Sequence, residues 1–243
     1  MKVDILAFGA HPDDVELSCS GTLLRHIDMG KKVGLIDLTR GELGSRGSAD
    51  LRDQEAATSA KLMGASFREN LRLADGFFTY DQATLLKVIQ AIRQHQPEIV
   101  LANSLSDRHP DHGRAAKLVS DACFYAGLLR IETADNAGKV QTHWRPSAVY
   151  HYIQDKNLEP DFVVDITEYI DKKIELVQTF RSQFFQSDAA EYADEPETPI
   201  SSAGFMNFLK SKSATMGRPA NFDFAEGFQV GRTPGVQNLF DLS

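Results

Sequence analysis

The first 38 residues contain two short apolar runs separated by a helical pattern, and this order constrains the fold more than any other feature. Residues 3–9 are an apolar run that ends in glycine, and residues 32–38 are a second apolar run. Between them, residues 20–29 place apolar side chains at helical spacing, and Gly30 follows as a residue that ends helices. A strand, a helix and a strand in this order predict a βαβ unit with two parallel strands.

The same alternation continues along the chain. Helices are predicted at residues 51–63, 80–95, from 113 to about 125 and at 170–185, and strands at 70–73, 99–103, 146–153 and 162–166. From residue 187 the chain reads as an acidic loop to residue 199, a short helix at 204–213 and a tail rich in Gly, Pro, Asn and Phe from 217. We therefore predict an α/β fold, a Rossmann-like open and mostly parallel sheet with helices on both faces and a small C-terminal section. We expect one domain, with a core of residues 1–185 and residues 186–243 packed on it.

Charge and hydropathy exclude several classes of protein. The formal net charge of −8 argues against nucleic-acid binding, which requires a basic face. The chain has no apolar run long enough to span a bilayer and no signal-peptide pattern at its N-terminus, so we expect a cytoplasmic protein that binds no membrane. Cys19 and Cys123 lie in helical patterns and are expected to be buried free thiols.

Two motifs rich in histidine and aspartate each follow a predicted strand. The first reads His-Pro-Asp-Asp at residues 11–14, and the second reads Asp-Arg-His-Pro-Asp-His at residues 107–112. The carboxyl ends of parallel strands lie at one edge of a sheet, so we expect the two motifs to meet there. The glycine pattern of a dinucleotide site is missing, and Asp13 and Asp14 would repel a phosphate, so a nicotinamide or flavin enzyme is not expected.

The two motifs fit a divalent metal. His11 and Asp14 flank a proline that restricts the turn, so their side chains can converge on one point. A third ligand can come from the His-x-x-His at 109–112, and three protein ligands with an open position are typical of catalytic zinc. Asp13 is then free to take a proton from water. Either motif alone is common without a metal, but the two together favour a metal-dependent hydrolase.

The two motifs resemble the signature pair of the LmbE-like (PIG-L) N-acetylglucosamine deacetylases. The similarity extends over the first βαβ unit, the Gly/Arg loop at 41–49, Asp-Leu-Arg at 50–52 and Ala-Glu-Gly-Phe at 225–228. The chain is most similar to the bacillithiol biosynthesis deacetylases. This resemblance implies a zinc-dependent hydrolase, with Fe²⁺ as an alternative in cells, that removes the N-acetyl group from an anionic conjugate, N-acetylglucosaminyl malate.

Position by position, the resemblance implies three groups of site residues. The metal ligands are His11, Asp14 and His112. The catalytic residues are Asp13 as general base, His109 as the imidazolium that stabilises the oxyanion or protonates the leaving amine, and Asp111, which orients His109. The substrate-binding residues are Arg52 and Arg145.

One position departs from the family pattern. Some members place a tyrosine over the oxyanion from a C-terminal Gly-Tyr segment, and this chain has Gly204-Phe205 there. The hydroxyl is therefore either absent or supplied by another residue such as Tyr192. The loop at 41–49 is either a lid over the sugar or a mobile connection.

Four other functions remain open from the sequence. The substrate could be another N-acetyl sugar or amide. A non-haem Fe(II) enzyme also uses two His and one carboxylate, but it requires a β-rich barrel pattern that this chain lacks. A non-catalytic metal- or sugar-binding module needs neither Asp13 nor His109, and a glycosidase needs no metal. The sequence gives no interface signal, so a homo-oligomer is neither indicated nor excluded.

Overall fold

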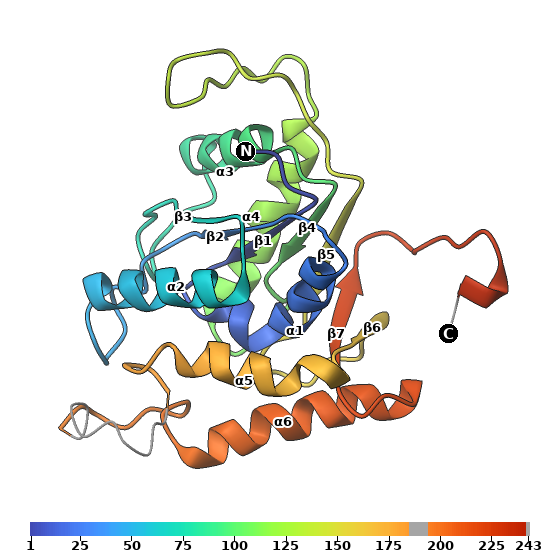
Figure 1. Ribbon diagram of the computed structural model, residues 1–243. Helices are drawn as coiled ribbons and strands as arrows, with labels where there is room; N and C mark the ends of the chain where they lie inside the picture. Colours follow the sequence, from blue (N-terminus) through green and yellow to red (C-terminus); the bar gives the residue numbers. More distant parts are fainter. Residues whose placement is uncertain (185–193, 242–243) are drawn as a thin grey trace.

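The computed structural model describes residues 1–184 and 194–241 and shows one central sheet surrounded by helices (Figure 1). The strands are β1 (Ile5–Gly9), β2 (Val33–Asp37), β3 (Phe67–Asn70), β4 (Ile99–Ala102), β5 (Ala148–Tyr152), β6 (Phe162–Asp165) and β7 (Ala225–Val230). The helices are α1 (Asp14–Asp28), α2 (Ala49–Met63), α3 (Gln82–His95), α4 (Pro110–Ala126), α5 (Ile170–Gln178) and α6 (Ala203–Gly217), with short 3₁₀ turns at Thr167–Tyr169, Arg218–Ala220 and Leu239–Asp241.

The strand order explains where a site can form. The sheet runs β3-β2-β1-β4-β5-β7-β6, and β3, β2, β1, β4 and β5 are parallel, whereas β7 is antiparallel to both of its neighbours. Ala7 at the centre of β1 is paired with Leu35 on one side and Leu101 on the other. After β1 the chain proceeds outward through β2 and β3, and then returns to the opposite side of β1 to form β4. Such a switch point leaves a crevice at the carboxyl ends of the two strands.

Both faces of the sheet are covered, as predicted. Leu6 and Phe8 of β1 pack in a core with α3 and α4, while Ile5 and Ala7 pack in a second core with α1 and α2. The alternation follows from strand geometry, in which successive side chains point to opposite faces. The central strands β1 and β2 are buried at every position because helices cover both sides of this part of the sheet. The predicted α/β fold class is therefore confirmed.

The helices α5 and α6 form a further layer beside α1 and α2 (Figure 1). An apolar cluster joins this layer to α2. It contains Val177 of α5, Phe180 and Phe184 just after that helix, Ala56 of α2 and Leu209 of α6. A buried ion pair also connects these layers. The ammonium of Lys173 lies 2.6 Å from Glu226 on β7, and Glu226 also accepts hydrogen bonds from two backbone N–H groups of α1.

Several predicted boundaries were wrong. Helix α1 begins at Asp14, not at residue 20, so its first turn carries part of the first motif. The third strand lies at Phe67–Asn70, earlier than predicted, and α5 ends at Gln178, before the predicted end at residue 185. The C-terminal tail contains β7, which the sequence analysis missed because Glu226 interrupts its apolar pattern. The carboxylate of Glu226 is buried, and its charge is balanced by the ammonium of Lys173.

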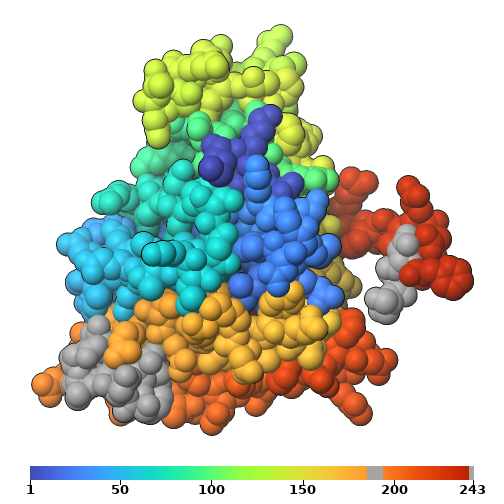
Figure 2. Space-filling view, in the orientation of Figure 1, coloured from blue at the N-terminus to red at the C-terminus, as the bar shows by residue number. Residues whose placement is uncertain are grey.

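The remaining composition-based expectations concern the cysteines and the membrane. Cys19 and Cys123 are buried and free, as predicted. Within residues 1–184 and 194–241, no helix has the length and apolar character that a membrane crossing requires. The last described segment, from residue 231 onward, extends away from the body of the molecule (Figure 2).

Candidate metal centre

The first motif lies in a tight turn between β1 and α1. Gly9 ends the strand, and a side chain on it would approach the carbonyl oxygen of His11 to 2.8 Å, so glycine is required for the turn to fold back. Thr39, which follows β2, donates from both its backbone N–H and its hydroxyl to the carbonyl of Ala10. The turn is therefore held from the neighbouring strand, and it presents His11 at the switch point.

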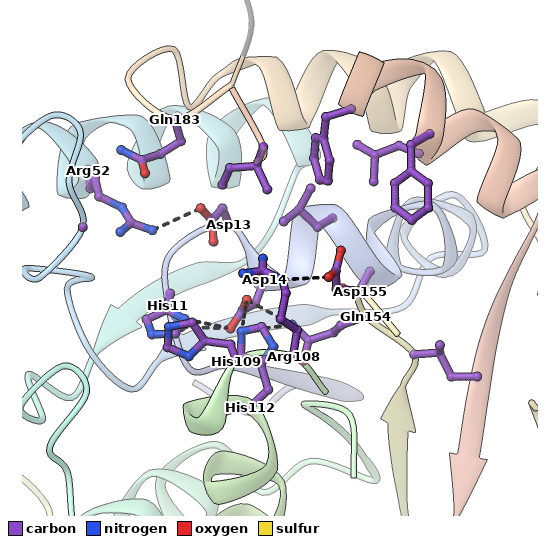
Figure 3. Close-up of a pocket in the computed structure, with 18 of the residues that line it drawn as sticks. His11, Asp13, Asp14, Arg52, Arg108, His109, His112, Gln154, Asp155 and Gln183 are labelled. Carbon is purple, nitrogen blue, oxygen red and sulfur yellow. Dashed lines mark hydrogen bonds and ion pairs between the residues drawn. The ribbon is translucent and has the colours of Figure 1, made fainter. Parts of the chain in front are cut away.

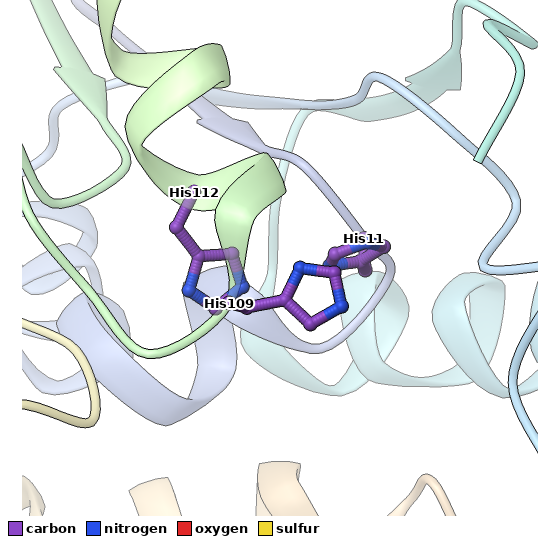
Figure 4. A group of neighbouring side chains, drawn as sticks. All are labelled: His11, His109 and His112. Carbon is purple, nitrogen blue, oxygen red and sulfur yellow. The ribbon is translucent and has the colours of Figure 1, made fainter. Parts of the chain in front are cut away.

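The second motif forms the start of α4. His109 caps the helix with Nδ1 accepting from the backbone N–H of Asp111 at 3.3 Å, and Pro110 occupies the first turn, where its fixed backbone suits a helix. One turn on, His112 faces the same cavity. The centroid of the His11 ring lies 4.7 Å from that of His109 and 5.5 Å from that of His112 (Figure 4). The structure thus brings the two motifs together.

Asp14 lies close to both of the predicted histidine ligands. His11 Nδ1 lies 3.6 Å from one carboxylate oxygen of Asp14, and His112 Nε2 lies 3.1 Å from the other. Donors that each lie about 2.0–2.2 Å from a tetrahedral zinc are about 3.4 Å apart. The nitrogen and oxygen donors also match the preference of zinc. Asp14 is therefore close enough to each histidine to share a zinc ion with it, and the donor types of His11, Asp14 and His112 suit that metal.

Two other donor groups compete with this set, and neither of them contains Asp14. The nitrogens of His11, His109 and His112 lie within 4.8 Å of one another, and so do donor atoms of His11, Asp75 and Asp111. Both groups share His11 with the predicted set. His11 is therefore the common point of every arrangement in the described residues that could hold a metal here.

Asp14 is fixed in place by three further donors. Its carboxylate accepts from the backbone N–H of His11 at 3.0 Å, from Asn103 at 2.9 Å and from Gln154 at 3.0 Å. Burial alone would raise the pKa of Asp14, but the neighbouring His112 and His11 hold it well below its ordinary value. The group is therefore a fully ionised carboxylate, as a metal ligand must be.

Carboxylates also support the far side of the histidine rings. His11 Nε2 lies 3.0 Å from Asp75 and 3.5 Å from Asp111, and His112 Nδ1 is hydrogen-bonded to Asp107. Because these carboxylates can only accept hydrogen bonds, the contacted ring nitrogens carry the protons. When a metal displaces the second proton of each ring, the nitrogens that face Asp14 are therefore the ones that provide the lone pairs.

The same carboxylates make the site favour positive charge. Burial opposes protonation of both rings, but the carboxylates around His11 raise its pKa well above the ordinary value, and Asp14 and Asp107 raise that of His112 to about 9.

Asp75 was not predicted from the sequence, because it lies in a short irregular segment after β3. Its only signal was an Asp-Gly pair following a strand.

The carboxylate of Asp111 does not contact His109, contrary to the prediction that Asp111 orients that ring. One of its oxygens accepts from the backbone N–H of Gly76 at 2.9 Å, and the other accepts from Arg114 at 2.8 Å. Only the backbone N–H of Asp111 contacts His109. The side chain starts on the first turn of α4 and points across to the His11 side, so it supports that ring instead.

Asp13 has the features of a tuned acid–base group. It is buried, with a φ of 124°, a backbone conformation that L-residues avoid and that costs about 1–3 kcal/mol. Burial raises its pKa to about 7, with the charge of Asp14 adding to this and Arg52 acting in the opposite direction. A carboxylate with a pKa near neutrality is suited to take up and release a proton.

Arg52 lies at the site but is occupied by protein partners. Its guanidinium lies 3.1 Å from Asp13 and donates to the carbonyl oxygens of Pro12 and Gly41 (Figure 3). Gly41 has a φ of 65°, and a side chain there would collide with the guanidinium, so this glycine creates the space for Arg52. In the structure Arg52 therefore positions Asp13, and it also lines the pocket.

Arg145 does not lie in this pocket. It precedes β5, at the opposite end of the strand, where its guanidinium packs 4.3 Å from the ring centroid of Phe124 and donates to the carbonyl of that residue. Arg145 directly precedes this strand, and its assignment to the site came from the family resemblance, which took no account of the direction of the strand. We therefore leave Arg145 out of the site, contrary to the sequence prediction.

The donors surround a cavity of about 300 Å³. His11, Asp13, Asp14, His109 and His112 form its floor, and Gln154 and Asp155 border it (Figure 3). Burial lowers the pKa of His109, and the nearby His11 and His112 lower it further. His109 is therefore a neutral ring at pH 7. With its Nδ1 accepting from backbone, the proton lies on Nε2.

Phe205 and the 41–49 loop, both noted in the sequence, lie at this cavity. Phe205 lines it, in the place where the family pattern has tyrosine, and Tyr192 lies outside the described residues. Leu43 and Gly44 line it too, so the 41–49 loop borders the pocket. That loop is held by Arg46, which donates to the carbonyl of Ser182 at 2.8 Å.

Comparison with known proteins agrees with this geometry. The family model described as PIG-L, GlcNAc-PI de-N-acetylase, matches residues 6–123, which include both motifs. A conserved protein of Thermus thermophilus has a crystal structure that superposes with a TM-score of 0.83 at 32% identity, covering 96% of this chain and 97% of that one. The chain belongs to the PIG-L deacetylase family.

Two curated relatives of this PIG-L protein carry names that describe different reactions. A diacetylchitobiose deacetylase of Thermococcus kodakarensis is 27% identical over 74% of this chain and 70% of its own length. A 4-oxalmesaconate hydratase of Pseudomonas putida is 28% identical over 73% of each. Similarity at this level therefore does not name the substrate.

Proposed function

We propose that this PIG-L protein is a zinc-dependent hydrolase that removes the N-acetyl group from an N-acetylglucosaminyl conjugate. The observation that carries the proposal is the position of Asp13, a buried carboxylate with a pKa near 7, next to the donor set of His11, Asp14 and His112. A site that only bound a metal would have no use for a strained acid–base group beside it.

His11, Asp14 and His112 would hold the zinc ion. When bound, zinc lowers the pKa of water and polarises a carbonyl group. The carboxylates of Asp75 and Asp107 keep the protons of His11 and His112 on the nitrogens that face away from Asp14. They thereby fix the orientation of the rings, as carboxylates behind metal-binding histidines commonly do.

Asp13 would take the proton from the attacking water. Its side chain is held by Arg52 on one side and borders the cavity on the other. The tetrahedral species formed on the acetyl carbon carries a negative oxygen, and the Nε2–H of His109 is available to donate a hydrogen bond to it. The proton held by Asp13 can then pass to the departing amine, which leaves acetate and a free amino sugar.

His109 acts in this scheme as a neutral donor, not as the imidazolium suggested by the sequence resemblance. The lowered pKa of His109 and the backbone hydrogen bond at its Nδ1 both support this form. A preorganised donor of this kind is worth about 10²–10³ in turnover in other hydrolases.

The test is release of acetate by metal-free and zinc-loaded protein. The substrates are N-acetylglucosamine, N,N′-diacetylchitobiose and N-acetylglucosaminyl malate, the conjugate favoured by the sequence resemblance. Zinc-dependent release from at least one of them supports the proposal. Failure to release acetate from all three, with one zinc bound per chain, would contradict it and would point to another reaction, such as that of the hydratase relative.

A further inference from the structure

The chain leaves the body of the molecule after β7 and presents apolar side chains to solvent. Residues 231–240, here called the arm, are exposed at every position and extend away from the sheet (Figure 1). Leu239 is 80% exposed, and Phe240 is 97% exposed, the highest value among the large apolar side chains of the described residues. A phenylalanine that contacts so little contributes nothing to the stability of a single chain, so its place at the end of an extended segment calls for a contact outside that chain.

The sequence of the arm suits it to reach outward. Gly231, Pro234 and Gly235 disfavour a continuation of β7, because proline cannot donate to a strand ladder and glycine weakens a strand. An extended segment from Gly231 to Phe240 spans at most about 30 Å. The arm is therefore long enough to cross onto a neighbouring molecule.

A cavity on the other side of the molecule from the metal pocket's α5 and α6 layer has the lining that the end of the arm lacks. It lies between α3 and α4, has a volume of about 540 Å³ and is here called the α3–α4 groove. Its apolar side chains are Tyr80, Leu85, Leu86, Ile89, Tyr125 and Ile131. Ile89 belongs to the buried core, whereas Tyr80 is 46% exposed at the rim. A leucine and a phenylalanine would find apolar contacts on all sides of such a groove.

Exposed apolar side chains connect the root of the arm with the α3–α4 groove. Residues 231–235 border a further cavity that Phe124 also lines, and the next residue, Tyr125, lines the α3–α4 groove. Phe124 is 55% exposed, and Leu129, which follows α4, is 75% exposed. Two copies that face each other through these residues would each place the root of the arm near the groove of the other copy.

The charges of the arm and of the groove are complementary. Arg232 is the only charged residue between positions 231 and 240. The groove is bordered by two carboxylates, Asp81 and Glu132, and by one cation, Arg130. The arm thus brings a positive charge and no carboxylate to a rim with an excess of negative charge.

We propose that the arm is an assembly element whose end, Leu239 and Phe240, docks in the α3–α4 groove of a second copy of this chain. Because the arm and the groove belong to the same chain, two copies can exchange arms reciprocally and close the contact on itself. The groove shares no lining residue with the metal pocket, so this assembly does not depend on the proposed reaction.

The first experiment measures the molar mass of the full chain by light scattering over a dilution series. We expect the wild type to be at least a dimer, and the double variant Leu239→Ser, Phe240→Ser to dissociate at a concentration at least about tenfold higher, because a buried aromatic anchor commonly carries that share of a contact. Met29→Ser is the control, since Met29 is 65% exposed at the end of α1, and it should dissociate as the wild type does. A monomeric wild type, or an assembly that the double variant leaves unchanged, would overturn the inference.

The second experiment locates the arm by a disulfide between two differently tagged chains, one with Leu239→Cys and the other with Leu85→Cys. The native Cys19 and Cys123 are buried, so they should contribute little background. We expect mild oxidation to join the two tags, and to join them at least about tenfold less when Met29→Cys replaces Leu85→Cys. Equal yields in the two mixtures would overturn the inference. A chain with both Leu239→Cys and Leu85→Cys that cross-links only to itself would also overturn it, because the arm would then occupy its own groove.

Discussion

Asp75 offers a quantitative test of how the metal centre is held. Its carboxylate accepts from His11 Nε2 at 3.0 Å with one oxygen and from the backbone N–H of Leu43 at 2.9 Å with the other. In Asp75→Asn, one of the two positions receives an NH₂ group, which cannot accept. One hydrogen bond is therefore lost in either orientation of the amide, and His11 loses part of its constraint.

The expected loss can be stated as a zinc affinity. Removing a carboxylate behind a metal-bound histidine costs about 10–100-fold in metal affinity in other proteins. Asp111 remains near His11 Nε2 at 3.5 Å, so we expect the lower end, about tenfold or about 1.4 kcal/mol, for Asp75→Asn. The double variant with Asp111→Asn should lose about 100-fold.

The assay is competition for zinc with a chromogenic chelator, with thermal unfolding of the metal-free protein as the folding control. Asp155→Asn is the matched variant, since Asp155 lines the same pocket but pairs with Arg108 and has no contact with His11. Zinc affinity within twofold of the wild type in Asp75→Asn, with unfolding unchanged, would refute the reasoning that Asp75 fixes His11.

Three further predictions test other parts of the structure. Asp13→Ala should lower turnover by about 10²–10⁴-fold and keep one zinc per chain; loss of zinc together with recovery of activity on re-metallation would contradict its role as base. Lys173→Met leaves the buried Glu226 without its cation and should cost about 3–5 kcal/mol in urea unfolding, whereas a loss below about 1 kcal/mol would show that the pair contributes little. Burial lowers the pKa of His151 below 6.5, so at this position the unfolded chain binds a proton that the folded chain does not, and the contribution of His151 to stability should fall as the pH drops below about 6.5. The melting temperature of His151→Gln relative to the wild type should therefore rise between pH 7.5 and pH 5.5, and an unchanged difference between the two proteins would count against this view.

The core of the fold and the meeting of the two motifs could be predicted from the sequence. β1 is apolar at consecutive positions, as a strand covered on both faces must be, and βαβ units fix the direction of the strands that follow. Parallel strands end at one edge, so His11 and His112, about 100 residues apart in the sequence, were expected together without any knowledge of side-chain contacts.

The elements that were missed depend on long-range contacts. Strand β7 carries the buried Glu226, whose charge is paired with Lys173 on α5, and no local pattern signals that pair. Asp75 reaches His11 across 64 positions of sequence from an irregular segment. The roles of Asp111 and Arg145 were taken from the family resemblance. The carboxylate of Asp111 lies toward His11, a direction that sequence spacing does not give. Arg145 precedes β5 and so lies at the end of that strand away from the site.

Anomalous diffraction at the zinc edge, from crystals of the zinc-loaded protein, would locate the metal directly. We expect one peak in contact with His11, Asp14 and His112, beside the carboxylate of Asp13 but not bound to it. A peak among His11, Asp75 and Asp111, or one held by the three histidines without Asp14, would contradict the proposed metal centre and the role of Asp75 behind it.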